Sequence, residues 1–232
     1  MEFFAAVEAR RSCRRYTSEP VPAEVMNRAI DAALLAPNSS NMQLWQFYWV
    51  RSPEKKKALG EACFSQPAAT TAQELVVCVG RRDLWRRNSE LIIEELNKNP
   101  KMPKQAFLYY KRLMPMTYTY GVFNIWGYLK FGILNLAGLF RPSPRKPNFK
   151  SDIFEVIHKS NALACENFML AIAAQGYASC PMEGFDECRV KRLLNLNRHS
   201  QVTMVLGVGR ADPVGIWGNR FRIPRTQTVF EV

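Results

Sequence analysis

The sequence predicts a single domain in which helices pack around a β-sheet, of the α/β or α+β class. Three β-rich runs, residues 46–50, 74–79 and 201–208, alternate with segments whose apolar residues recur at helical spacing. The chain has 232 residues, of which 47% are hydrophobic, so it can bury one full core. No internal repeat interrupts it. We therefore expect one domain that spans residues 1–232.

The first helices and strands follow from local patterns. Phe3, Phe4 and Val7 have the spacing of a short helix. Pro22 suits the start of a second helix, which we expect over residues 23–35. The first two β-rich runs come next along the chain.

A long helix is expected between the second and third β-rich runs, from about Asp152 to Gln175. Ser151 or Asp152 would cap its start, and Gly176 would end it. A short strand, Tyr177 to Ser179, is expected directly after that glycine, before the third β-rich run.

The chain carries a formal net charge of +12, which implies an anionic partner such as a phosphorylated cofactor, acidic lipid or nucleic acid. Nucleic acid is the weakest of these candidates, because the basic residues are dispersed and no nucleic-acid-binding motif is visible. We therefore expect no nucleic-acid partner.

Cysteine and histidine usage argues against metal chemistry and hydrolytic triads. The six cysteines form no CxxC pair, and the two histidines, His158 and His199, have no partner at the required spacing. Any catalysis should therefore depend on a bound cofactor. The residues before the first arginines are too few for a signal peptide, so a reduced, cytoplasmic protein is expected.

Two basic clusters are candidates for a phosphate site. The run Arg10-Arg11-Ser12-Cys13-Arg14 crowds three guanidinium groups together, and Arg220 and Arg222 lie near the carboxyl end. Arginine binds phosphate with a planar fork of donors, and a serine hydroxyl adds another hydrogen bond. The alternative for the first run is a solvated basic turn. Convergence of both clusters on one phosphate is our hypothesis.

Two loops complete the candidate site, although each is also consistent with an ordinary turn. The first, Pro37-Asn38-Ser39-Ser40-Asn41-Met42-Gln43-Leu44-Trp45, places small polar residues between a predicted helix and a predicted strand. The second, Pro181-Met182-Glu183-Gly184-Phe185, contains a glycine that would let backbone N–H groups approach a ligand closely.

Together these four segments resemble the FMN-dependent nitroreductase family, whose pattern is an RRSxR-type start, a PSSxNxQPW-type loop, a PxEGF-type turn and a late basic pair. The resemblance covers roughly residues 1–80 and 151–232. Asn38 stands where the family usually has serine, which removes a hydroxyl contact, and Leu44 stands where it usually has proline, which would loosen the loop.

The resemblance implies an α+β, three-layer fold with a central mixed or antiparallel sheet flanked by helices, in an entwined homodimer. One FMN would lie at each end of the interface, and the loop 37–43 would reach the flavin of the partner subunit. The FMN-binding residues implied are Arg10, Arg11, Ser12, Arg14, Pro37, Asn38, Ser39, Asn41, Gln43, Pro181, Met182, Glu183, Gly184, Arg220 and Arg222.

The activity implied is ping-pong transfer of hydride from NAD(P)H through flavin N5 to a small acceptor. Arg14 would lie near flavin N1 and O2, where a cation raises the reduction potential. A backbone N–H near Glu183 and Gly184 would donate to N5, and no side chain need be a catalyst. The alternatives are a flavin-linked dehalogenase or dehydrogenase of the same family, and a non-catalytic, basic, membrane-associated flavin-binding protein.

Residues 81–150 do not match the pattern, and we expect them to form an apolar helical insertion. Within it, residues 116–140 carry one charge, Lys130, and are long and apolar enough to cross a membrane. A crossing would separate the two halves of the site, so we expect either a lid over the flavin or an element at a membrane surface. Both would favour a lipophilic acceptor such as a nitroaromatic, quinone or enone.

Overall fold

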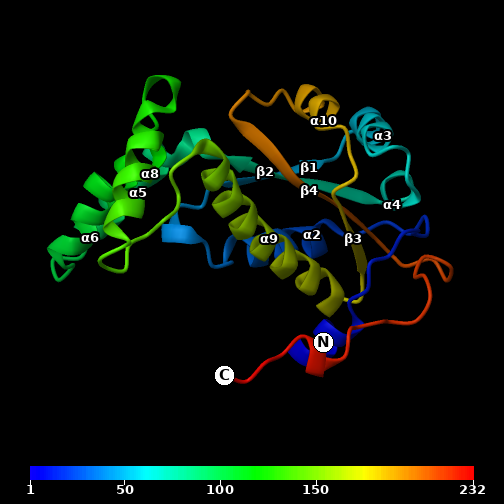
Figure 1. Ribbon diagram of the computed structural model, residues 1–232. Helices are drawn as coiled ribbons and strands as arrows, with labels where there is room; N and C mark the ends of the chain where they lie inside the picture. The colour runs from blue at the N-terminus through cyan, green and yellow to red at the C-terminus, as the bar shows by residue number, and fades with distance from the viewer.

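The computed structural model describes all of residues 1–232 and contains one four-stranded sheet in the order β1-β2-β4-β3 (Figure 1). All three neighbouring pairs are antiparallel, and the register places Phe47 opposite Cys78, and Val77 opposite Val205. The strands are β1 (Trp45–Val50), β2 (Glu74–Arg81), β3 (Ala178–Met182) and β4 (Ser200–Gly209).

Helices cover both faces of the sheet, as alternation along β2 requires. Leu75, Val77 and Val79 pack with residues of α3, α4 and α10, whereas Val76 and Cys78 pack with α2 and α9. These helices are α2 (Ala23–Leu34), α3 (Pro53–Ala62), α4 (Pro67–Thr70), α9 (Lys150–Ala174) and α10 (Glu187–Leu193), and a short α1 (Phe3–Ala9) precedes them. The predicted α+β, three-layer fold with an antiparallel sheet is confirmed.

The long helix α9 begins two residues before the predicted start, so the expected cap is wrong. Asp152 lies inside the first turn, where its carboxylate accepts hydrogen bonds from the backbone N–H groups of Asn148 (2.8 Å) and Phe149 (3.0 Å). The predicted end is confirmed, because Gly176 takes a φ of 80° just beyond the helix.

The strand β3 is longer than predicted and shifted toward the carboxyl end. It runs from Ala178 to Met182 and therefore includes Pro181, which we had placed in the following turn. Proline is tolerated there because β3 lies at the edge of the sheet. Gly184, in the turn that remains, does not have a positive φ, so the turn makes no use of a left-handed conformation there.

The segment between β2 and α9 is built from short helices: α5 (Trp85–Asn97), α6 (Lys104–Leu108), α7 (Met114–Tyr118) and α8 (Ile125–Ala137). Positive φ angles at Gly121, Phe123 and Asn124 divide the apolar run 116–140 between α7 and α8, so it is not one continuous helix. None of the helices has both the length and the apolar character that spanning a membrane demands.

A third core cluster attaches this helical segment to the rest of the domain. Met42 and Leu44, from the loop before β1, pack with Tyr118 of α7 and with Ile153 and Ile157 of α9. In Figure 1, α5, α6 and α8 lie together at the left, beyond the amino-terminal end of α9. The candidate loop therefore lies between the helical segment and the long helix.

Candidate functional site

The basic run 10–14 extends the edge of the sheet beside β3. The backbone N–H of Cys13 donates to the carbonyl of Ser179 (3.1 Å), and Ser12 forms a parallel bridge with the same residue. Further along, Tyr16 pairs with Ala211 and donates its hydroxyl to the carbonyl of Gly207. The arginines thus lie along one sheet edge and not in a freely solvated turn.

The carboxyl-terminal segment folds back onto this run. Arg11 donates to the carbonyls of Trp217 (3.3 Å) and Gly218 (2.9 Å), and Arg220 donates to the carbonyls of Glu8 (2.7 Å) and Arg10 (2.6 Å). The structure thus brings Arg220 against the amino-terminal run from more than two hundred residues away. One terminal nitrogen of Arg220 makes both hydrogen bonds and so attaches the carboxyl-terminal segment to the amino-terminal run, a contact that the sequence did not suggest.

Arg222 is not brought into the cluster. Its guanidinium donates only to the carbonyl of Phe221, and its side chain is exposed. Its predicted proximity to the first run is therefore not seen in the single chain.

Fixed partners orient the guanidinium groups of Arg10 and Arg14 and leave donors free. The Nε of Arg10 lies 3.3 Å from a carboxylate oxygen of Glu166 in α9, so its terminal nitrogens remain available. Arg14 lies over the ring of Trp217, 4.7 Å from the centroid. Burial raises the pKa of the Cys13 thiol, so this cysteine fills space among the arginines and is not an activated nucleophile.

The polar loop before β1 is held in an unusual backbone conformation. Ser40, Asn41 and Gln43 all have positive φ angles, between 48° and 57°, which cost energy for residues with a side chain. The Oδ1 of Asn38 accepts a hydrogen bond from the N–H of Gln43 (2.8 Å). Asn38 thus gives the loop an internal bond, and Leu44 is buried, so the loop is not loosened.

Residues that the sequence did not single out fix this loop from outside. Asn88 of α5 donates to the carbonyls of Met42 (2.8 Å) and Gln43 (3.1 Å). Tyr110 donates to the carbonyl of Ser40, and the hydroxyls of Tyr109 and Ser40 lie 2.6 Å apart. No sequence signal marks these side chains, because each acts on a loop 45 to 70 positions away.

The long helix α9 holds the polar loop and the arginine run at different places. The N–H of Ser39 donates to the hydroxyl of Ser160 (3.2 Å), and Arg10 pairs with Glu166. Six residues of α-helix correspond to about 9 Å along the axis and about 120° around it. Each chain therefore presents the loop and the arginines on different sides of α9.

The turn after β3 offers unpaired backbone donors. Glu183 and Gly184 are exposed, and their N–H groups donate to no other group of the chain. Gln66 donates to the carbonyl of Gly184 (3.0 Å), and Asp186 accepts from the N–H of Arg189 at the start of α10. The turn is thus held from both sides with its N–H donors facing solvent. It directly follows β3, the strand to which the arginine run is hydrogen-bonded.

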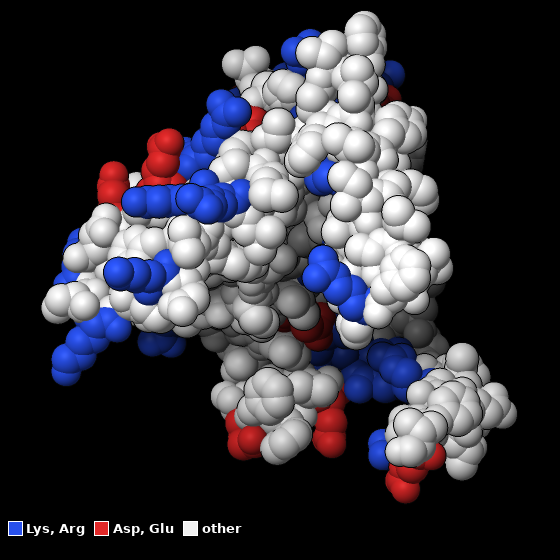
Figure 2. Space-filling view, turned by 60° about the vertical axis from the view of Figure 1, so that its left-hand side comes forward, with Lys and Arg blue, Asp and Glu red and all other residues white.

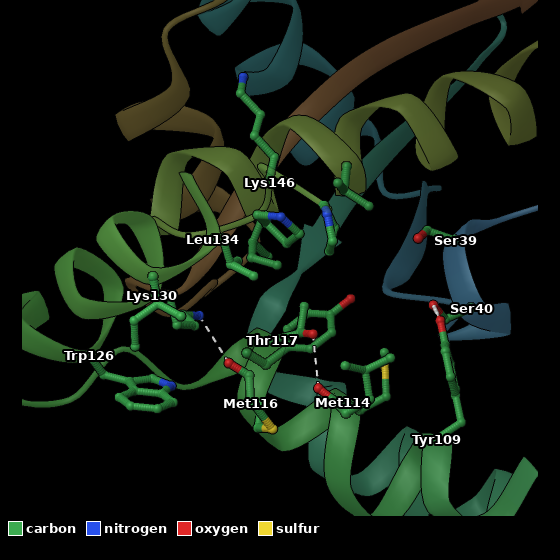
Figure 3. A pocket seen from close by; sticks show the side chains of 17 residues that line it. Ser39, Ser40, Tyr109, Met114, Met116, Thr117, Trp126, Lys130, Leu134 and Lys146 are labelled. Carbon is green, nitrogen blue, oxygen red and sulfur yellow. Dashed lines mark hydrogen bonds between the residues drawn. The ribbon is translucent and has the colours of Figure 1, made fainter. Parts of the chain in front are cut away.

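A cavity of about 390 Å³ lies between α7, α8 and the first turns of α9. Most of its wall is apolar, and Ser39, Ser40 and Tyr109 form one side of it (Figure 3). The polar loop therefore borders an apolar space that opens to solvent and that the helical segment helps to build.

Comparison with known proteins matches this arrangement to one family. The model described as Nitroreductase family matches residues 7–210. The chain is 28% identical to protein DrgA of Synechocystis over 211 residues, 90% of this chain and 84% of DrgA. It is 27% identical to an NADH dehydrogenase of Thermus thermophilus, over 93% of this chain and 90% of that one.

Solved structures share the fold. A nitroreductase family protein of Streptococcus pneumoniae superimposes with a TM-score of 0.72 and 20% identity over 100% of both chains. A structure from Exiguobacterium sibiricum, solved in complex with FMN, superimposes with a TM-score of 0.70 and 23% identity, over 100% of this chain and 98% of that chain.

The contacts of Asn88 predict that Asn88→Ala destabilises the domain. Two loop carbonyls would lose their donor, so we expect the free energy of unfolding to fall by about 1–3 kcal/mol in urea denaturation. Asn97→Ala, an exposed change in the same helix, should shift it by less than about 0.5 kcal/mol. Equal shifts for the two variants would contradict the role given to Asn88.

Proposed function

The chain belongs to the nitroreductase family, and from that premise we propose that it is an FMN-dependent NAD(P)H oxidoreductase. One observation carries the proposal. The Arg10 to Arg14 run, tied to the carboxyl-terminal segment through Arg220, lies along the sheet edge that ends in the free N–H groups of Glu183 and Gly184. Phosphate donors and donors for a flavin ring thus share one edge.

The residues present suit the phosphate of FMN. The terminal nitrogens of Arg10, the hydroxyl of Ser12 and the guanidinium of Arg11 would hold it, with Glu166 keeping Arg10 in place. Arg14, stacked on Trp217, would supply a fixed positive charge beside the ring. When bound, FMN supplies the hydride chemistry that links NAD(P)H to the acceptor.

The active unit is proposed to be a homodimer, in which the loop 37–43 serves the site of the partner subunit. The proposal is supported by α9, which anchors the loop at Ser160 and Arg10 at Glu166, six residues apart. A second copy would also cover large exposed apolar side chains of α1 and the carboxyl-terminal segment. These are Phe3, Phe4, Trp217, Phe221 and Phe230.

The acceptor is proposed to be small and lipophilic, such as a nitroaromatic, quinone or enone. The loop that would face the partner's flavin also borders the apolar cavity, so an apolar molecule leaving water would arrive beside the flavin. NAD(P)H and the acceptor would use the same flavin face in turn, in a ping-pong mechanism.

The outer face of α8 is proposed to contact acidic membranes. Its exposed side chains carry no charge, because the single charged residue of the run, Lys130, is buried. Figure 2, in which this side comes forward, shows broad uncharged areas with Lys and Arg among them. The exposed large apolar residues of α8 and of the residues just after it are Ile125, Tyr128, Leu129, Phe131, Ile133, Leu136, Leu139 and Phe140.

Charge reversal at the tether should abolish cofactor retention. In Arg220→Glu the carboxylate would lose both carbonyl contacts and repel the phosphate, so we expect the Kd for FMN to rise at least about tenfold, measured by quenching of flavin fluorescence. Arg198→Glu, remote from these contacts, should leave the Kd within about twofold. Retention of FMN by Arg220→Glu would contradict the phosphate site.

Anaerobic reduction of the bound flavin distinguishes an active reductase from a protein that only binds flavin. The purified protein should be yellow, and NADH or NADPH should bleach its flavin band under anaerobic conditions. A quinone such as menadione should then restore the band, and steady-state rates should give parallel lines in double-reciprocal plots. A flavin that no nicotinamide bleaches would instead support a non-catalytic binding protein.

Membrane contact can be measured by co-sedimentation with vesicles. The protein should sediment with phosphatidylserine vesicles at low salt and much less with phosphatidylcholine vesicles, since lysines and arginines flank the apolar face. Leu136→Glu should reduce sedimentation about tenfold, whereas Phe64→Glu, exposed after α3, should not. Absence of binding at low salt would remove the membrane proposal.

A further inference from the structure

The cavity beneath α8 combines an apolar wall with one buried ammonium group. Met114, Tyr118, Leu134 and Ile153 are among its lining residues, and none of the lining residues is an aspartate or glutamate. Lys130 also lines it, with only 8% of its surface exposed. One buried positive charge therefore lies in a largely apolar wall, and the second lining lysine, Lys146, is exposed and lies 3.3 Å from Glu155.

The ammonium of Lys130 is only partly satisfied by the chain. It donates to the carbonyl of Met116 (2.9 Å) and more distantly to that of Thr119 (3.5 Å), and it lies 5.2 Å from the ring centroid of Tyr120. An ammonium has three N–H donors, so at least one is left over. The carbonyl contacts position the side chain but give it no counter-ion.

The acidic groups nearest the cavity are already paired elsewhere. Asp152 accepts from the backbone at the start of α9, and Glu155 lies 3.3 Å from the ammonium of Lys146 and 2.6 Å from that of Lys159. No carboxylate lies within ion-pair distance of Lys130. Burial lowers the pKa of Lys130, and the negative charge of Asp152 acts more weakly in the opposite direction.

The two ends of the cavity differ in chemistry. In Figure 3, Lys130 and Trp126 lie on one side, and Ser39, Ser40 and Tyr109 lie across the space from them. The serine side belongs to the loop that would reach the partner's flavin. A ligand that spans the cavity would therefore have one end at the ammonium and the other at the loop.

We propose that this cavity is the acceptor site and selects an apolar molecule that carries a single carboxylate. The carboxylate binds the free N–H of Lys130, and the reducible end lies toward Ser39 and Ser40. A charge-assisted bond in a low-dielectric space is stronger than a neutral one, so the ammonium favours a carboxylate over an uncharged head group. The inference rests on the proposed function, because it names the substrate class of that site.

Calorimetric titration of the purified protein with three ten-carbon probes tests this assignment. Decanoate should bind at least about tenfold more tightly than decanamide, and decyltrimethylammonium should bind most weakly. In Lys130→Met the preference for decanoate over decanamide should disappear, while Lys130→Arg should keep most of it. Lys159→Met, which removes an exposed lysine outside the cavity wall, should match the native protein.

The result that overturns the proposal is equal binding of decanoate and decanamide by the native protein, or an unchanged preference in Lys130→Met. If Lys130→Met does not fold, Ile133→Trp, which fills the cavity from its wall, must abolish decanoate binding, and persistence of binding would refute the site. The titration needs no nicotinamide. A protein that reduces menadione but shows no decanoate preference therefore contradicts only this inference, and the converse contradicts only the proposed function.

Discussion

The rigidity of α9 is the constraint on which the proposed site depends. This helix runs across one face of the sheet and holds Ser39 through Ser160 and Arg10 through Glu166. Because a helix fixes the spacing of its side chains, the anchors of the polar loop and of the arginine run are held about 9 Å apart and about 120° around its axis. The loop of each chain is left facing outward with its conformation already set. The proposal that the site combines the loop of one chain with the arginines of another rests on this spacing.

The strained loop shows how tertiary contacts create what local sequence cannot. Three residues with positive φ angles would not persist in a free loop, yet Asn88, Tyr110 and the buried Met42 fix both its carbonyls and its core anchor. The helical segment that supplies Asn88 and Tyr110 also builds the apolar cavity. The loop geometry and the apolar cavity are thus two results of one packing arrangement.

Regular elements could be predicted because their signals are local. Alternating and helical apolar patterns located β1, β2, β4, α2 and α9 to within about two residues. Pro181 misled the prediction of β3, since an edge strand tolerates the residue that normally ends one. The run 116–140 misled it as well, because composition does not reveal a left-handed turn at Phe123 and Asn124.

The sequence predicted which residues belong to the candidate site, but it did not predict the contacts between them. The sequence identified Arg10, Arg11 and Arg220 as a group, but the tether from Arg220 to the carbonyl of Arg10 depends on how the carboxyl-terminal segment folds back. The sequence likewise did not indicate that Lys130 is buried. Spacing alone does not say which way one lysine turns in an apolar helix, and that direction decides both the character of the cavity and that of the outer face of α8.

A mixed dimer measures the central claim directly. One chain would carry Arg10→Glu, and the other Ser39→Trp, with different affinity tags so that the mixed species can be purified and its FMN content determined. If each site combines the arginines of one chain with the loop of the other, one site of the mixed dimer keeps both native parts, and it should bind about half the FMN of the native dimer while both parent homodimers bind almost none. A mixed dimer as empty as its parents would show that each site is built within a single chain.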